Sequence, residues 1–149
     1  MEKALTYLDL AKGNDSFFET NYQKQRVANN MVSEAYRACE NYLKYLIEQY
    51  DNEESLRHVG AMYSDKLQTL LDYLMRYMHI QIPDNKAYSI VQIDGFYRRT
   101  QYPGKDAVFA DANMIQECHI AVEVCRELAI NIIKEHGDIE PEMEDRSDG

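Results

Sequence analysis

Apolar residues recur at gaps of three and four over most of this chain, which is the period of amphipathic helices. One such stripe runs through residues 21–50 and predicts the clearest helix of the chain. Its members are Val27, Met31, Ala35, Cys39, Tyr42, Leu46 and Ile47. Similar stripes run through residues 54–79 and 111–136. The pattern therefore predicts three long helices, the last of them stopped by Gly137.

Two shorter helices complete the prediction. The first covers residues 2–12 and is broken by "GNDS". The other covers "AYSIVQIDGFYRR", with Asp84 or Asn85 as its N-cap, after "IQIPDNK" has stopped the helix before it. "YSIVQI" also alternates like a strand, but a lone strand has no partner here, so we favour a helix. Ser55 or Asn52 is the expected N-cap of the helix over residues 54–79.

These elements favour an all-α protein. The expected architecture is an up-down antiparallel bundle of about five helices. A single domain is expected over residues 1–136. Residues 137–149 contain six acidic residues and one arginine, and are expected to be an acidic disordered tail.

Composition adds limits on location and partners. No apolar run is long enough for a membrane span, and the N-terminal "MEKALTYLDLAKGND" lacks the apolar segment of a signal peptide. We therefore expect a cytoplasmic protein with no membrane partner. The formal net charge of −10 argues against a broad duplex-binding surface, because phosphate binding depends on lysine and arginine. A small basic pocket remains compatible with that charge.

Cysteines and histidines give few signs of metal or catalytic chemistry. Cys39, Cys118 and Cys125 fall within apolar helical stripes, where a free cysteine behaves as a small hydrophobe. We expect no metal, no cofactor and no structural disulfide. His119 and Glu123 are four residues apart and can meet as an acid–base pair or a surface pair, of which the surface pair is favoured.

The stretch "GFYRRTQYPG", residues 95–104, is the strongest candidate for a ligand site. Arg98 and Arg99 stand beside aromatic rings that include Tyr102, and Lys105 follows. Arginine pairs with phosphates bidentately and tyrosine stacks on bases, so this cluster could bind a nucleotide or single-stranded RNA. The alternative is a simple helix end whose arginines pair with acids of neighbouring helices.

A second candidate lies in "LRHVG" near the start of the helix over residues 54–79. Arg57 and His58 are polar groups that could join the site of Arg98, Arg99, Tyr102 and Lys105. Gly60 is unusual inside a helix, because glycine costs about 1 kcal/mol there relative to alanine. Either a neighbouring helix or a ligand approaches it closely, and close helix packing is the favoured interpretation.

Three segments, in order, resemble the HEPN (higher eukaryotes and prokaryotes nucleotide-binding) domain family. "AYRACENYLKYLI" resembles its second-helix signature, "LRHVGAMYSDKLQTLL" the following helix, and "FYRRTQYPG" its tyrosine and Arg-Tyr-Pro before the final helix. The resemblance covers about residues 20–135. It implies a helical, often dimeric bundle that binds nucleotides or acts in RNA processing. It also implies a nucleotidyltransferase as a possible partner protein, as in two-component toxin-antitoxin systems.

The sequence departs from that family in two ways. No histidine follows an arginine at the spacing of the family's ribonuclease motif, Arg-x4-6-His, so we expect a non-catalytic domain. The arginine directly before Tyr-Pro is replaced by Gln101. The leading prediction is thus binding of a nucleotide or of a nucleotidyltransferase-type partner. The alternative is a helical interaction module or homodimer without a small-molecule ligand, since twelve tyrosines and seven methionines provide adaptable helix faces.

Overall fold

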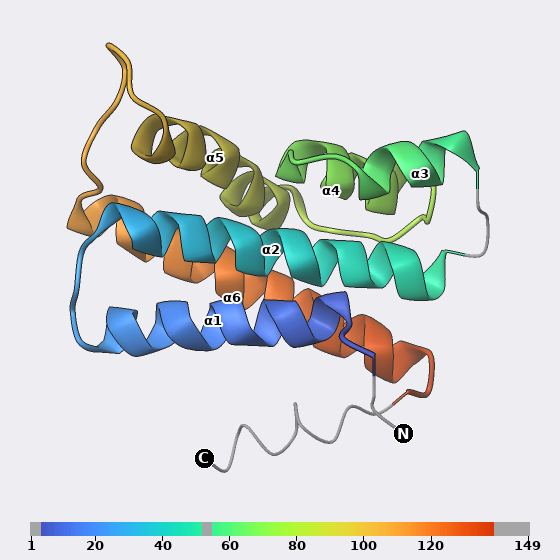
Figure 1. The fold of residues 1–149 in the computed structure, drawn as a ribbon. Coiled ribbons are helices and arrows are strands. Elements are labelled where there is room, and N and C mark those ends of the chain that lie inside the picture. The colour runs from blue at the N-terminus through green and yellow to red at the C-terminus, as the bar shows by residue number, and fades with distance from the viewer. Residues whose placement is uncertain (1–3, 52–54, 139–149) are drawn as a thin grey trace.

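The computed structural model describes residues 4–51 and 55–138, and Figure 1 labels the helices of these parts. They are α1 (Tyr7–Gln23), α2 (Asn29–Tyr50), α3 (Leu56–Met62), α4 (Leu67–Arg76), α5 (Asp84–Gln101) and α6 (Ala112–Glu135). All regular structure in the described ranges is helical, which confirms the all-α class, with six helices where about five were expected. The predicted acidic tail, from residue 139 onward, lies outside the described residues.

The four longer helices form an up-down bundle around α2. Figure 1 shows α2 and α6 running in one direction, with α1 and α5 running in the opposite direction. The short helices α3 and α4 pack beside the C-terminal half of α2 (Figure 1), and α2 contacts each of the other five helices. This arrangement makes α2 the central element of the fold.

The apolar stripe of α2 is the centre of the core, as its spacing predicted. Its buried members include Met31, Cys39 and Tyr42, while Val27 lies before the helix and is 46% exposed. The largest fully buried side chains come from all parts of the fold: Tyr42, Phe18, Met31, Leu43, Leu46, Leu70, Ile90 and Ile115. Full burial of one such apolar side chain stabilises a protein by about 1.5–3 kcal/mol, so this core is the main source of stability.

The prediction for the first helix was wrong, because "GNDS" does not break it. Helix α1 begins after a capping box of Thr6 and Asp9 and continues through residues 13–16 to Gln23. Asn14 and Asp15, which favour turns in isolation, are bonded to neighbouring helices instead. The Asn14 amide donates to Glu34 at 2.9 Å and its carbonyl oxygen accepts from Asn41 at 2.9 Å. Tertiary hydrogen bonds thus override the local preference of these residues.

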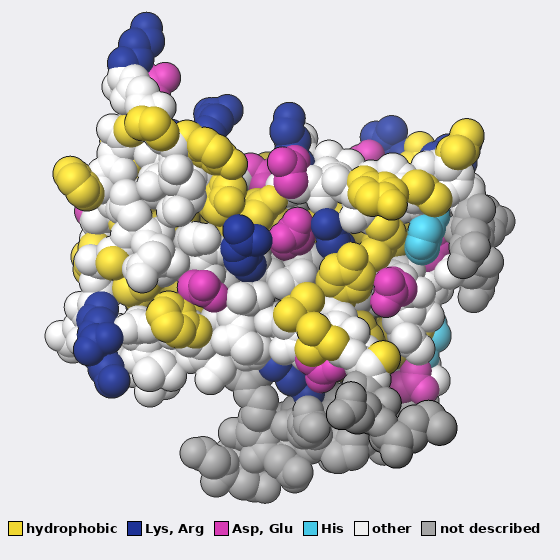
Figure 2. Space-filling model, in the orientation of Figure 1, with side chains coloured by type: hydrophobic (Ala, Val, Ile, Leu, Met, Phe, Trp, Pro, Cys, Tyr) yellow, Lys and Arg dark blue, Asp and Glu magenta, His cyan; other side chains and the backbone are white. Residues whose placement is uncertain are grey.

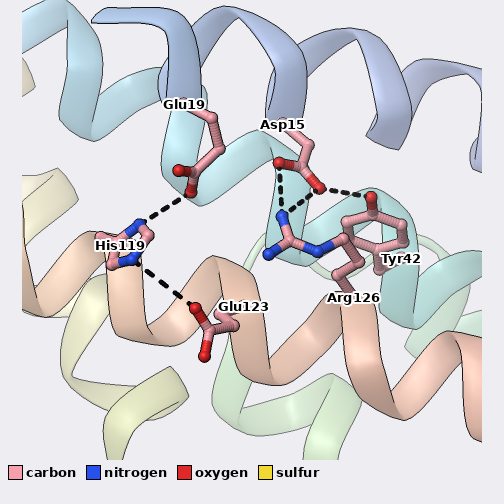
Figure 3. A network of polar contacts seen from close by, with 6 residues as sticks. All are labelled: Asp15, Glu19, Tyr42, His119, Glu123 and Arg126. Carbon is pink, nitrogen blue, oxygen red and sulfur yellow. Dashed lines mark hydrogen bonds and ion pairs between the residues drawn. The ribbon is translucent and has the colours of Figure 1, made fainter. Parts of the chain in front are cut away.

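Asp15 is the only buried residue with a charged side chain in the described part of the chain. Its carboxylate accepts the Tyr42 hydroxyl at 2.6 Å and Arg126 Nη1 at 2.9 and 3.0 Å (Figure 3). Burial lowers the pKa of the Arg126 guanidinium, but the charge and hydrogen bonds of Asp15 outweigh this and raise it. The ion pair therefore joins α1 to α6, and the Tyr42 hydroxyl ties α2 to the same carboxylate.

The long helix predicted over residues 54–79 is two helices. Ser55 caps α3 as expected, accepting the His58 amide at 3.2 Å, but α3 ends at Met62. Helix α4 then begins where the carboxylate of Asp94, on α5, accepts the amides of Leu67 and Gln68 at 2.9 and 3.1 Å. A side chain distant in sequence provides this cap, and the apolar period alone gave no sign of it.

Helix α5 confirms the choice of helix over strand for "YSIVQI", with Ile90 and Ile93 buried. Its N-cap is Pro83, without a side-chain bond, so the expected caps at Asp84 and Asn85 were wrong by one or two residues. Helix α6 ends as predicted before Gly137, whose φ of 75° suits glycine. The prediction of close helix packing at Gly60 was also wrong, because a Cβ there meets nothing within 4 Å.

All three cysteines are free and buried. Burial raises the pKa of the Cys118 thiol to about 12, and a hydrogen bond between Cys39 and Cys125, together with burial, raises the pKa of the Cys39 thiol. These side chains act as small apolar groups of the core. No helix in the described ranges combines the length and apolar character that crossing a membrane requires.

Candidate functional site

A pocket of about 500 Å³ lies between the middle of α2, the start of α4 and the C-terminal half of α5. We call it the α2–α5 pocket. It is lined by Tyr36, Arg37, Glu40, Asp65, Lys66, Gln68, Asp94, Gly95, Tyr97, Arg98 and Tyr102. Its volume is within the usual range for small-molecule sites. The lining combines tyrosine rings with charges of both signs, so the arrangement of these groups decides what it can bind.

Three tyrosines form an aromatic wall. The rings of Tyr36 and Tyr97 are stacked with centroids 4.1 Å apart, and Tyr102 meets Tyr97 edge-on at 6.1 Å. Tyr36 is buried and fixed, whereas Tyr102 is 58% exposed. Burial raises the pKa of the Tyr36 and Tyr97 hydroxyls, although Arg37 partly lowers that of Tyr97. The hydroxyls of Tyr36 and Tyr97 therefore stay protonated near neutral pH, and more than half of the Tyr102 side chain is accessible to a ligand.

Three cations surround this wall. Among the described residues, no ion pair involves Arg37, Lys66 or Arg98, and all three side chains are exposed. Guanidinium and ammonium groups without acid partners can donate to a phosphate without first breaking an ion pair. The α2–α5 pocket therefore has free positive charge despite the acidic protein around it.

Two of the three acids in the lining have other partners. Glu40 pairs with Lys44 at 3.2 Å, one turn along α2. Asp94 caps α4, and burial raises its pKa although its bonds to the Leu67 and Gln68 amides lower it. Asp65 remains as an exposed acceptor at the edge. The free charges of the pocket are thus mostly positive.

The structure divides the six predicted site residues among several places. Arg98 and Tyr102 both line the α2–α5 pocket. Arg99, the neighbour of Arg98, turns away: its Nε donates to the Gly95 carbonyl at 3.4 Å and its guanidinium lies 5.6 Å from the Phe96 ring centre. Lys105 is exposed in the turn after α5. The two arginines that looked equivalent in sequence therefore have different environments.

The remaining two predicted residues belong to α3, away from this pocket. The Arg57 guanidinium lies 4.8 Å over the Tyr77 ring centre and lines a separate cavity. His58 Nδ1 donates to Asp51 Oδ2 at 2.8 Å, and the Tyr73 hydroxyl donates to the same oxygen. His58 is thus held in a polar network that joins α3 to the ends of α2 and α4.

Sequence reasoning missed Arg37, Lys66, Tyr36 and Tyr97 as pocket residues. Arg37 lies outside the apolar stripe predicted for residues 21–50, and Lys66 lies at a helix break that the sequence did not predict. Tyr97 stands within "GFYRRTQYPG" but was not assigned a separate role. Only the tertiary fold brings these side chains together from three helices.

Gln101, which replaces the arginine before Tyr-Pro, has a structural role. Its amide donates to the Asn29 carbonyl at 2.8 Å. The Asn29 side chain in turn donates to the Thr100 carbonyl at 3.0 Å and accepts the Ala110 amide at 2.6 Å. These bonds fix the end of α5 and the connection to α6 against the start of α2. They hold Tyr102 at the mouth of the α2–α5 pocket.

The pair His119 and Glu123 is present but is part of a larger cluster on α1 and α6 (Figure 3). His119 Nε2 lies 3.6 Å from Glu123, its Nδ1 contacts Glu19 at 2.9 Å, and its ring stacks on Tyr22 at 4.1 Å. Burial raises the pKa of Glu19, while the charge and bond of His119 lower it. Both ring nitrogens face carboxylates, which favours a structural role for this histidine.

In comparisons with known proteins, the chain matches no protein-family model, no curated protein and no solved structure. The HEPN resemblance therefore stays a prediction from three sequence segments.

Proposed function

We propose that this chain is a non-catalytic, HEPN-like helical domain that binds a nucleotide in the α2–α5 pocket. One observation carries the proposal: Arg37, Lys66 and Arg98, none in an ion pair with another described residue, surround a stacked tyrosine wall. Phosphate groups are the ligands that such cations recognise, and a base can stack on the exposed ring of Tyr102. The absence of an Arg-x4-6-His motif from the sequence supports a non-catalytic role.

The acids of the pocket fit the same ligand. Asp65 is exposed near Lys66 and can accept hydrogen bonds from ribose hydroxyls, a role that carboxylates have in many nucleotide sites. Glu40 and Asp94 are occupied by Lys44 and by the α4 amides, so they repel phosphate less than free carboxylates would. The ligand we expect is therefore a mononucleotide or the end of a single-stranded RNA.

Adjacent arginines provide a matched test. The affinity is measured by titration calorimetry, with and without magnesium. The ligands are nucleoside mono-, di- and triphosphates and a short single-stranded RNA. Arg98→Ala should weaken binding by about tenfold or more, since a charge-assisted contact is lost. Arg99→Ala, next in sequence but turned toward Phe96, should leave it unchanged. Equal losses in both variants, or no binding by the parent protein, would refute the proposal.

A second candidate, the interaction module or homodimer, is favoured by the outer face of α3. Leu56, Val59 and Tyr63 follow at helical spacing and are 91%, 45% and 86% exposed. Figure 2 shows hydrophobic side chains gathered over this helix. Light scattering after size exclusion tests it: a dimer that Leu56→Asp turns into a monomer supports this candidate. A wild-type monomer at all concentrations rules out the homodimer.

A further inference from the structure

A second cavity lies where three helices end, separate from the α2–α5 pocket. Its volume is about 380 Å³. We call it the end cavity. It is lined by Tyr50, Asp51, Ser55, Arg57, Tyr73, Tyr77, Met78, His79, Ile80 and His136. These residues come from the C-terminal ends of α2, α4 and α6 and from the start of α3. No function considered so far uses this cavity.

The positive charge of the end cavity is Arg57. Its guanidinium carbon lies 4.8 Å over the centre of the Tyr77 ring, and no ion pair with another described residue occupies its N–H groups. Stacking on an aromatic ring holds a guanidinium in place while its edge remains free to pair with a carboxylate. Arg57 is therefore a prepared partner for one oxyanion group.

The negative side of the cavity comes from Asp51 and the helix ends. A helix C-terminus has about half a negative charge, and three of them line this cavity, whereas the N-terminus of α3 adds about half a positive charge. Asp51 and the three C-termini still outweigh this charge and that of Arg57 together, so a purely anionic ligand is disfavoured. Tyrosine faces also attract cations. The environment thus favours a ligand that carries one charge of each sign.

The backbone of His79 is a separate indication that the end cavity is a ligand site. It has φ of 57° and holds the position after α4 where the Ile80 amide returns to the Leu74 carbonyl at 3.0 Å. Glycine is the preferred residue for such a left-handed helix end, and a larger side chain there is strained. The imidazole of His79, at a position where glycine is usual, lines the end cavity. A residue less favourable to the fold is thus present where a ligand would meet it.

We propose that the end cavity binds a small zwitterion, an α-amino acid with an apolar side chain. Its carboxylate pairs with the edge of Arg57, and its ammonium lies toward Asp51 and the helix C-termini. Its side chain packs on Met78, Ile80 and the tyrosine rings. This assignment does not depend on nucleotide binding in the α2–α5 pocket, because the two cavities share no lining residue.

Three related probes separate the two charges. The probes are L-phenylalanine, 3-phenylpropionate, which lacks the ammonium, and phenethylamine, which lacks the carboxylate. Each is titrated into the full chain, and the NMR signals of the histidine side chains are followed. We expect L-phenylalanine to bind at least about tenfold more tightly than either analogue and to shift the signals of His79 and His136. Equal binding of an analogue, or no saturable binding of L-phenylalanine, overturns the proposal.

Matched variants locate the ligand. Arg57→Gln should abolish the preference for L-phenylalanine over phenethylamine, while Arg76→Gln, an exposed arginine paired with Asp72, should keep it. His79→Gly should weaken binding without lowering the Tm. Gln25→Gly, which relieves the same backbone strain after α1 with φ of 59°, should leave binding unchanged. If His79→Gly binds as tightly as the parent protein, the ligand does not occupy the end cavity next to His79, and the proposal is overturned.

Discussion

The buried carboxylate of Asp15 gives the strongest test of this structure. Asp15→Asn keeps the size of the side chain and can still accept from Tyr42, but it removes the charge that faces Arg126. Asp15 is 0% exposed, and breaking a buried ion pair by removing one partner costs about 3–5 kcal/mol. A domain of this kind is stable by only about 5–15 kcal/mol, so the loss is large.

The assay is urea unfolding followed by circular dichroism, together with thermal melting. At about 2–4 °C per kcal/mol for a domain near this size, the Tm of Asp15→Asn should fall by about 6–12 °C at the low end of that cost. Asp72→Asn is the matched control, because its pair with Arg76 is 3.4 Å long and both side chains are more than half exposed. Exposed pairs contribute little, so this control should melt near the parent protein.

A double variant separates the charge from the packing. Asp15→Asn with Arg126→Met removes both charges, so it should be less destabilised than the sum of the single changes, by about 1–3 kcal/mol. Strict additivity would mean that the two side chains do not interact in the native state. A cost under about 1 kcal/mol for Asp15→Asn alone would show that the carboxylate is not buried as described.

Three other predictions concern glycines within helices, the buried thiols and Glu19. Gly95→Ala and Gly13→Ala should each raise the free energy of unfolding by up to about 1 kcal/mol in melting experiments, since a Cβ meets nothing within 4 Å at either site. A lower Tm for either variant would contradict this. The buried thiols should resist iodoacetamide until urea unfolds the chain, because Cys118 has a pKa of about 12; rapid alkylation in the native state would contradict this. The pKa of Glu19 is raised in the folded state, so its contribution to stability is present below about pH 4.5 and is lost as the pH rises through its folded pKa. Glu19→Gln should therefore reduce the change of the urea midpoint with pH over that range. A pH profile identical to that of the parent protein would refute the assignment.

The sequence predicted those elements whose causes are local. The apolar period found the cores of α2 and α6. Ser55, one of the two expected N-caps, begins α3, and Gly137 follows the end of α6 as predicted. It failed where distant side chains decide the backbone. Tyr42 and Arg126 keep Asp15 within α1, and Asp94 starts α4 from another helix.

The candidate site divides in the same way. Arg98 and Tyr102 were found because they cluster in sequence, and the pocket places them together. Arg37 and Lys66 come from other helices and have no local signal, so only the packing of α2, α4 and α5 reveals them. Arg99 shows the reverse error, since adjacent residues on a helix point in directions about 100° apart.

The ion pair of Asp15 and Arg126 joins residues 111 positions apart in the chain. During synthesis, α1 and α2 leave the ribosome long before α6 exists, so Arg126, the ion-pair partner of Asp15, is not yet present. The first helices can dock only with this charge still hydrated, because burying it unpaired is costly. The nascent bundle should therefore remain loose and chaperone-accessible until α6 arrives, and become native in one late cooperative step.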